Sequence, residues 1–238
     1  MATLTSEAVQ EAVNAAFASW VAGEPSAVNW QYLCRVDPAK GFPQSSVSHT
    51  AFAAALFGEV AALVRTEDSI ARVTYRGVPK DEQDRLQTYI STRLPGIQIE
   101  RREHCTLDFA LLAKRASTNQ PHPVRLAVES EMKPISGKGT DPDLLVYDLV
   151  KLSMIDATYK LYIGRVNRGR ETVGGNKEGK WTRLRPVIEA ALAFEGNRAA
   201  EAVAVLLETQ QEGPWRCHVV GRESGQSPFS KTFEINDT

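Results

Sequence analysis

The chain has 238 residues, which suffices for one large domain or two small ones, and its 42% hydrophobic and 24% charged residues are typical of a soluble globular protein. No apolar run approaches the roughly 20 residues that a membrane-spanning helix needs, so we expect a cytoplasmic protein with no membrane partner. A formal net charge of −1 excludes a basic footprint over the whole surface, so a nucleic-acid partner would require a local basic patch. Three widely spaced cysteines, Cys34, Cys105 and Cys217, argue against a disulfide framework or a zinc knuckle.

The first part of the chain is predicted to be mainly helical. Residues 3–22 and 49–65 carry apolar side chains at helical spacing. Residues 80–94 form a clearer amphipathic helix, which a Pro-Gly pair ends. A short strand is expected at 71–78, between the second and third helices.

The rest of the chain alternates strands with helices. Three strands are expected in succession, the first two joined by a hairpin-short connection, and a helix then leads to a fourth strand. These elements are strands 97–103, 106–114 and 124–131, a helix from about 140 to 155, and strand 157–166, followed by a helix at 181–194 and strands at 201–208, 215–220 and 228–235. This order predicts an α/β (α+β) fold, a mixed central β-sheet flanked by helices, as one domain over residues 1–238.

Three acidic residues lie near the ends of neighbouring predicted strands. In the stretch VRLAVESE, side chains alternate between faces, so Glu129 and Glu131 project from one face while Val128 enters the core. Asp108 lies near the start of the preceding strand. Carboxylate oxygens are the ligands that Mg2+ prefers, and the ion polarises a phosphodiester and lowers the pKa of a bound water. We therefore expect Asp108, Glu129 and Glu131 to bind Mg2+, with Mn2+ as a substitute, and Glu131 to act as the base or as a second-metal ligand.

The same acids also have a simpler interpretation. Glu129 and Glu131 can be solvated residues on an exposed strand face, satisfied by Arg125 and its neighbours. Spacing alone favours neither reading, so both stay open at this point.

The order of elements adds a resemblance to a known family. A helix, a strand, a strand with an early Asp, a strand with Glu-x-Glu, a helix and a strand resemble the core of the PD-(D/E)xK nuclease superfamily, which includes many restriction endonucleases. In that family, an acid early in the second strand and an E-x-K on the third build the metal site. Asp108 and Glu129 match these positions, whereas Glu131 stands where lysine is usual. A minority of restriction enzymes carry glutamate there, and Lys133, just beyond the strand, can supply the positive charge.

The resemblance implies a metal-dependent DNA endonuclease, with a type II restriction enzyme as one candidate and a homodimer if both strands of a palindrome are cut. It implies a nuclease-like core over about 48–166, completed by the C-terminal helix and strands of 181–235. The family often adds an acid from a preceding helix. Glu59, beside the apolar arc of its helix, is the expected outer ligand and catalytic acid, with Glu82 as the rival. Because buried acids are usually paired, an arginine partner is the alternative for Glu59.

The segment 165–185, RVNRGRETVGGNKEGKWTRLR, carries seven basic against two acidic residues, an excess of five positive charges. A basic, glycine-rich segment beside a metal site suits binding to a phosphate backbone, with a strong dependence on salt. Trp181 can stack on a base. The alternative is an ordinary solvated loop before a helix. The expected DNA-binding residues are Arg168, Arg170, Lys177, Lys180 and Arg183.

Two other functions are weighed against the nuclease. A non-catalytic nucleic-acid- or protein-binding module on a decayed nuclease fold is favoured by Glu131 and by the near-zero net charge. The spacing of Gly174, Gly179 and Lys180 satisfies G-x4-G-K, most of a nucleotide-binding P-loop. Trp181 then stands where a P-loop needs Ser or Thr to hold Mg2+, so nucleotide binding is not expected.

Overall fold

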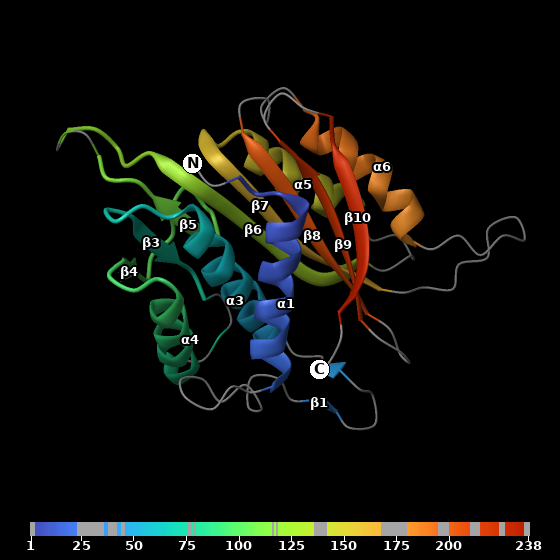
Figure 1. Ribbon diagram of the computed structural model, residues 1–238, viewed down its shortest axis with the longest axis horizontal. Helices are drawn as coiled ribbons and strands as arrows, with labels where there is room; N and C mark the ends of the chain where they lie inside the picture. Colours follow the sequence, from blue (N-terminus) through green and yellow to red (C-terminus); the bar gives the residue numbers. More distant parts are fainter. Residues whose placement is uncertain are drawn as a thin grey trace, which may run out of the picture.

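The computed structural model describes residues 3–22, 36–37, 42–43, 46–75, 78, 80–115, 117, 119–135, 142–167, 180–194, 200–209, 215–223 and 227–235. Within these ranges, five helices flank one sheet of eight strands (Figure 1). The helices are α1 (Ser6–Ala22), α3 (Ser46–Val64), α4 (Lys80–Arg93), α5 (Pro142–Ser153) and α6 (Lys180–Leu192). The strands of the sheet are β3 (Ile70–Val73), β4 (Gln98–Glu100), β5 (Phe109–Leu112), β6 (Val124–Ile135), β7 (Ala157–Asn167), β8 (Glu201–Thr209), β9 (Trp215–Arg222) and β10 (Phe229–Ile235), while β1 (Val36–Asp37) and β2 (Phe42–Pro43) pair separately.

The sheet is mixed, with the strand order β10-β9-β8-β7-β6-β5-β3-β4. Strands β6, β7 and β8 run parallel, and α5 and α6 make the two connections between them. The other neighbours are antiparallel, except for the parallel edge pair of β3 and β4. The predicted α/β fold with a mixed central sheet and flanking helices is therefore confirmed. Among the described residues, no helix combines the length and the hydropathy that a membrane span requires.

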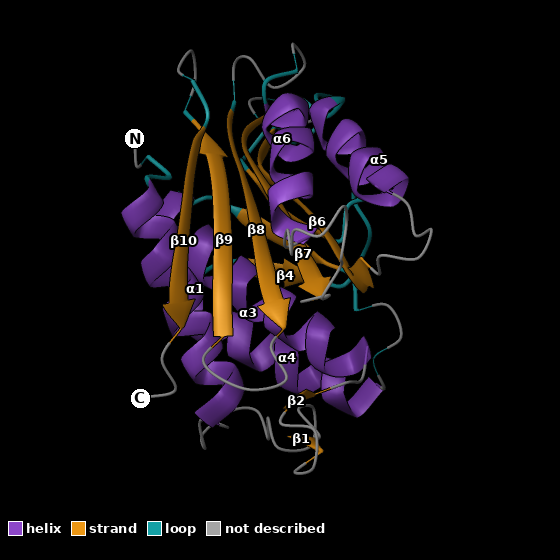
Figure 2. Cartoon of the chain, turned by 90° about the vertical axis from the view of Figure 1, so that its right-hand side faces the viewer, coloured by secondary structure: helices purple, strands orange, loops and turns teal. Residues whose placement is uncertain are grey.

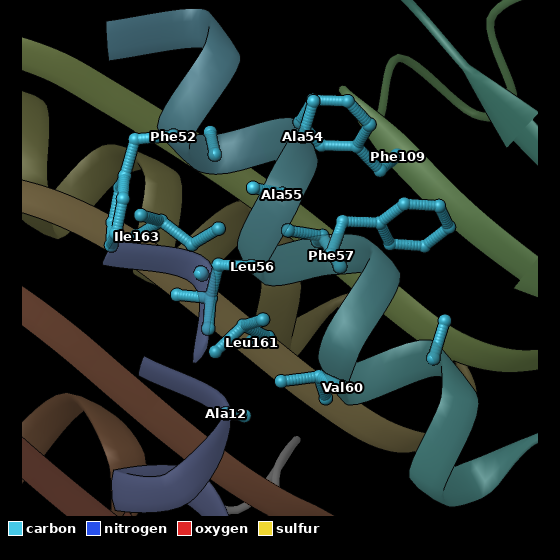
Figure 3. Packing of buried hydrophobic residues seen from close by; sticks show 14 of the residues in the cluster. Ala12, Phe52, Ala54, Ala55, Leu56, Phe57, Val60, Phe109, Leu161 and Ile163 are labelled. Carbon is cyan, nitrogen blue, oxygen red and sulfur yellow. The ribbon is translucent and has the colours of Figure 1, made fainter. Parts of the chain in front are cut away.

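The helices cover the sheet on both faces. Helices α5 and α6 pack on one face, whereas α1, α3 and α4 pack on the other (Figure 2). On the second face, Phe52, Leu56 and Phe57 of α3 lie against β5 and β7 (Figure 3). The rings of Phe57 and Phe109 stack with their centroids 5.2 Å apart. Each such side chain stabilises the fold by roughly 1.5–3 kcal/mol on burial, which makes this layer the main anchor of β5.

One strand pairing differs from the prediction. The segment 97–103 was expected to be the first of three neighbouring strands, but only Gln98–Glu100 is a strand, and it lies at the edge of the sheet. On the side away from β6, the neighbour of β5 is β3, which runs antiparallel to it. The backbone N–H of Thr74 extends this pairing by donating to the carbonyl of Asp108 at 2.8 Å. Alternation identifies a strand and its buried face but not its partner, so the hairpin was wrong while the strands themselves were recovered.

The topology brings several chain segments to one region of the sheet. Because β5 runs antiparallel to β6, the start of β5 lies beside Val128, in the middle of β6. Because β6, β7 and β8 are parallel, their carboxyl ends share the same edge. Helix α5 follows β6 and returns over it. Polar side chains near these ends are therefore brought close together from positions far apart in the sequence.

Candidate active site

Asp108 lies immediately before β5, beside the middle of β6. Phe109 pairs with Val128, so the residue before Phe109 meets the residues after Val128. Asp108 Oδ2 accepts hydrogen bonds from both the backbone N–H and the hydroxyl of Ser130, each 2.9 Å long. These two bonds fix the Asp108 carboxylate against β6.

Glu129 is almost wholly buried on the face of β6 that α5 covers, with 4% of its surface exposed. Lys151 of α5 places its Nζ 2.6 Å from Glu129 Oε1. The pKa of Glu129 is raised from its ordinary 4.5 to about 7, chiefly by burial; Lys151 opposes the rise, and the charges of Asp108 and Asp148 contribute to it. Glu129 therefore exchanges its proton near neutral pH, which is the range that acid–base chemistry uses.

The turn before Asp108 is strained. Cys105 and Thr106 have φ angles of 51° and 64°, a left-handed conformation that a β-branched residue such as threonine rarely adopts. Lys151 Nζ donates a hydrogen bond of 2.7 Å to the carbonyl oxygen of Thr106. Backbone strain of this kind costs about 1–3 kcal/mol and persists only where surrounding contacts hold it. One ammonium group therefore ties Glu129 to the turn that positions Asp108.

Two further carboxylates complete the charge pattern. Glu131 lies two residues beyond Glu129 on the same face of β6. Asp148 approaches from α5, and its pKa is raised from 3.8 to about 6, chiefly by burial; the charges of Glu131 and Asp108 contribute to the rise, and Lys151 opposes it. Four carboxylates therefore interact electrostatically around a single lysine.

The residues present suit a hard cation, although they do not form a complete cage. Among the described residues, no three His, Cys, Asp or Glu side chains converge closely enough to hold a metal ion. The donor set consists of carboxylate oxygens, which Mg2+ prefers, and Mg2+ commonly uses only one or two of them and keeps several waters. Repulsion among the carboxylates contributes to both raised pKa values, and an added cation would relieve that repulsion.

Glu59 is not brought to this group. It lies on α3, on the opposite face of the sheet, and its Oε1 is 2.6 Å from Arg93 Nε and accepts a 3.3 Å hydrogen bond from Tyr89. The expectation that Glu59 is an outer ligand is thus replaced by the alternative of an arginine pair. The physical reason is that α3 turns this side toward α4, where Gly58 packs on Arg93. The rival, Glu82, lies on α4 with its side chain outside the described residues.

The expected DNA-binding residues lie largely outside the described part of the chain. Arg168, Arg170 and Lys177 fall outside it, and Lys180 and Arg183 belong to α6 with side chains that are not described. Trp181 is described, and its ring stacks on His218 with centroids 4.1 Å apart and planes inclined by 12°. One face of the Trp181 ring is therefore already occupied, which leaves at most the other face for a base.

Sequence reasoning missed four residues that the structure adds to the site. Ser130, Asp148, Lys151 and Tyr162 all contact or face the carboxylates. Asp148 could have been found from the sequence, because it lies three residues after Leu145 and so borders the apolar stripe of its helix. The positive charge was expected from Lys133, which lies in β6 with a side chain outside the described residues, whereas Lys151 is the cation seen at Glu129.

Comparisons of the chain with protein-family models, with curated proteins and with solved structures found no match. The functional argument therefore depends on the chemistry and geometry of the site.

Glu129 should make the stability of the protein depend on pH. Its folded-state pKa of about 7 exceeds the ordinary 4.5, so the folded protein holds a proton that the unfolded chain releases between these values. The free energy of unfolding should therefore fall as pH rises through this window, by on the order of 3 kcal/mol at about 1.4 kcal/mol per pKa unit. Urea denaturation across this range should give a flatter profile for Glu129→Gln. An equally steep fall in the variant would contradict the assignment.

Lys151 should hold the pKa of Glu129 down. In Lys151→Met, the cation that opposes the rise is lost, so the pKa of Glu129 should climb above its wild-type value. Carboxyl 13C NMR of glutamate-labelled protein measures this directly. Lys114→Met is the matched control, because Lys114 pairs with the exposed Asp68 at 3.5 Å and should leave Glu129 unchanged. An unchanged pKa in Lys151→Met would rule out the ion pair in solution.

Proposed function

We propose that this protein is a metal-dependent DNA endonuclease that hydrolyses phosphodiester bonds at the carboxylate site beside the middle of β6. The observation that carries this proposal is that Asp108 and Glu129, from adjacent antiparallel strands, interact electrostatically beside Lys151, with Glu131 two residues further along β6. Hard oxygen donors beside a partly exposed ammonium group are a combination suited to a divalent cation and a phosphate together.

The topology supports the same proposal. The elements α3, β3, β5, β6, α5 and β7 follow the order of helix, three strands, helix and strand that the PD-(D/E)xK resemblance implies. The early acid falls at the start of β5 and Glu-x-Glu falls on β6, while α4 and β4 are inserted between the first two strands. Agreement of a whole chain order is more specific than agreement of a short motif.

Lys151 takes the role that the superfamily gives to a lysine on the third strand. That strand position holds Glu131 in this chain, and the ammonium group arrives from α5 instead, 2.6 Å from Glu129 Oε1. A positive charge there stabilises negative charge that develops on the phosphoryl group during hydrolysis. The same group orients Glu129, so Lys151 both positions a ligand and assists the reaction.

The remaining roles follow from burial and charge. Asp108 and Glu129 would hold Mg2+, or Mn2+ in its place, and the ion when bound polarises the phosphodiester and acidifies a bound water. Ser130 orients Asp108 through its two hydrogen bonds. Glu131 would accept a proton from the attacking water or bind a second ion. Asp148, with a pKa of about 6, can share this role near neutral pH.

DNA as the substrate follows from the basic segment 165–185. It joins the end of β7 to α6, and β7 ends three residues beyond Gly164, the cross-strand partner of Glu131. Positive charge there would bind the phosphate backbone, and a protein that cuts both strands of a palindrome would act as a homodimer. A cytoplasmic location would give the enzyme access to DNA.

A second candidate is a non-catalytic binding module on a decayed nuclease fold. It is favoured because no three metal ligands converge among the described residues and because Lys151 already pairs with Glu129. Calorimetric titration with Mg2+ or Mn2+ separates the two functions, since a decayed site takes up neither ion.

Isosteric changes at the site should abolish cleavage without unfolding the protein. We expect Asp108→Asn and Glu129→Gln to lose Mg2+-dependent cleavage of plasmid DNA, because each removes a charged metal ligand, while their circular dichroism stays native. Glu59→Gln is the matched control, because Glu59 is also ion-paired but lies on the opposite face and should keep its activity. Full activity in both site variants would end the nuclease assignment.

Charge reversal in the basic segment should weaken DNA binding most at low salt. In the triple variant Lys177→Glu, Lys180→Glu and Arg183→Glu, attraction to phosphate becomes repulsion, and fewer counterions are released on binding. Fluorescence anisotropy over a salt series should show a lower affinity and a shallower salt dependence. Equal affinity at every salt concentration would remove this segment from the interface.

A further inference from the structure

Tyr162 lies in β7 directly across from Glu129, on the sheet face that α5 and α6 cover. Its side chain is 1% exposed. The ring leans along the strand over Gly164, since a Cβ added there would lie 2.7 Å from Tyr162 Cε1 and 3.2 Å from its hydroxyl oxygen. Gly164 is in turn the cross-strand partner of Glu131. The missing side chain at 164 therefore lets the phenol reach along the row of acids.

The hydroxyl of Tyr162 has no hydrogen-bond partner among the described residues. A buried hydroxyl without a partner costs on the order of 1–3 kcal/mol, so folded proteins rarely retain one without a reason. Burial, and then the charges of Asp148, Glu131 and Glu129, raise the pKa of Tyr162 well above its ordinary value of 10. The phenol therefore keeps its proton and can serve as a hydrogen-bond donor.

A second buried tyrosine shows what the environment adds. The Tyr75 hydroxyl is also buried without a partner among the described residues, but it packs in the cluster on the opposite face of the sheet. The charge that acts on Tyr75 is that of Arg101, whereas Tyr162 feels three carboxylates. Tyr75 thus offers an orphan hydroxyl of the same kind, away from the site.

We propose that the Tyr162 hydroxyl, whose ring occupies the position over Gly164, donates a hydrogen bond to a phosphoryl oxygen of the substrate beside the carboxylates. This inference rests on the proposed function and assigns Tyr162 as a substrate-binding residue. A phosphoryl oxygen is an anionic acceptor of the kind that an orphan phenol lacks. It can enter an acidic site only with a cation, which the carboxylates attract, and Lys151 lies on the same site.

The test compares Tyr162→Phe with Tyr75→Phe. Thermal unfolding without ligand should give Tyr162→Phe an unchanged or higher midpoint, because the change removes an unsatisfied group. Calorimetric titration of inorganic phosphate in the presence of Mg2+ should show about tenfold weaker binding in Tyr162→Phe, the size expected for a hydrogen bond to a charged group, and wild-type binding in Tyr75→Phe. Gly164→Ala, which pushes the ring away, should weaken phosphate binding in the same way.

Three results would overturn the proposal. The first is a phosphate affinity in Tyr162→Phe equal to that of the wild type. The second is a loss of binding of Mg2+ alone as large as the loss of phosphate binding. The third is a clear destabilisation of the variant, which would reveal a structural hydrogen bond. Failure here is distinguishable from failure of the proposed function. If Tyr162→Phe binds phosphate normally while Glu129→Gln abolishes DNA cleavage, only the role of Tyr162 is lost. If phosphate binding depends on Tyr162 but no DNA is cut, the phosphate site stands without the nuclease.

Discussion

The Lys151 ammonium group is the contact on which the whole site depends. It lies 2.6 Å from the buried carboxylate of Glu129 and donates to the carbonyl of Thr106 at 2.7 Å. Without a cation, burying Glu129 close to Asp108 and Asp148 would be opposed both by desolvation and by repulsion. The same contact holds the left-handed turn before Asp108. One side chain therefore stabilises both the buried carboxylate and the strained turn. This explains how the folded protein tolerates a site so rich in acidic residues.

The sheet explains why these groups meet at all. Antiparallel pairing brings the start of β5 beside the middle of β6, and the parallel crossover through α5 returns Asp148 and Lys151 over the same region. The face on which they meet is mainly apolar, packed by leucines of α5 and α6. A low-dielectric surround strengthens every charge interaction within it, so the pKa values of Glu129 and Asp148 move toward neutrality. The fold thus prepares titratable groups in the pH range where hydrolytic chemistry operates.

Much of this could be predicted from the sequence, because part of it is local. Alternation along 124–131 identified the shared face of Glu129 and Glu131, and the order of strands placed Asp108 beside them. The partner of β5 could not be predicted, since pairing with β3 depends on long-range contacts that alternation does not encode. Glu59 was misjudged for a related reason. Its position at the border of an apolar arc indicated partial burial, but a helix pattern does not say which face of the sheet the helix covers.

Lys151 and Tyr162 were missed because their roles exist only in three dimensions. Lys151 is an ordinary charged residue in the last turn of a helix until α5 is laid over β6. In the sequence, Tyr162 has the pattern of a core aromatic residue. Only the position of its ring over Gly164 and the nearby acids indicate a role for its hydroxyl.

We propose that these carboxylates form a cation site in which Lys151, among the described residues, compensates only part of the charge. This proposal is tested most directly by following the pKa of Glu129 in the wild-type protein by carboxyl 13C NMR, first without and then with Mg2+. The account predicts a pKa of about 7 without the ion and a clear downward shift as Mg2+ is added, because a bound cation favours the ionised carboxylate. A pKa near the ordinary 4.5 in the absence of the ion, or no response to Mg2+, would contradict it.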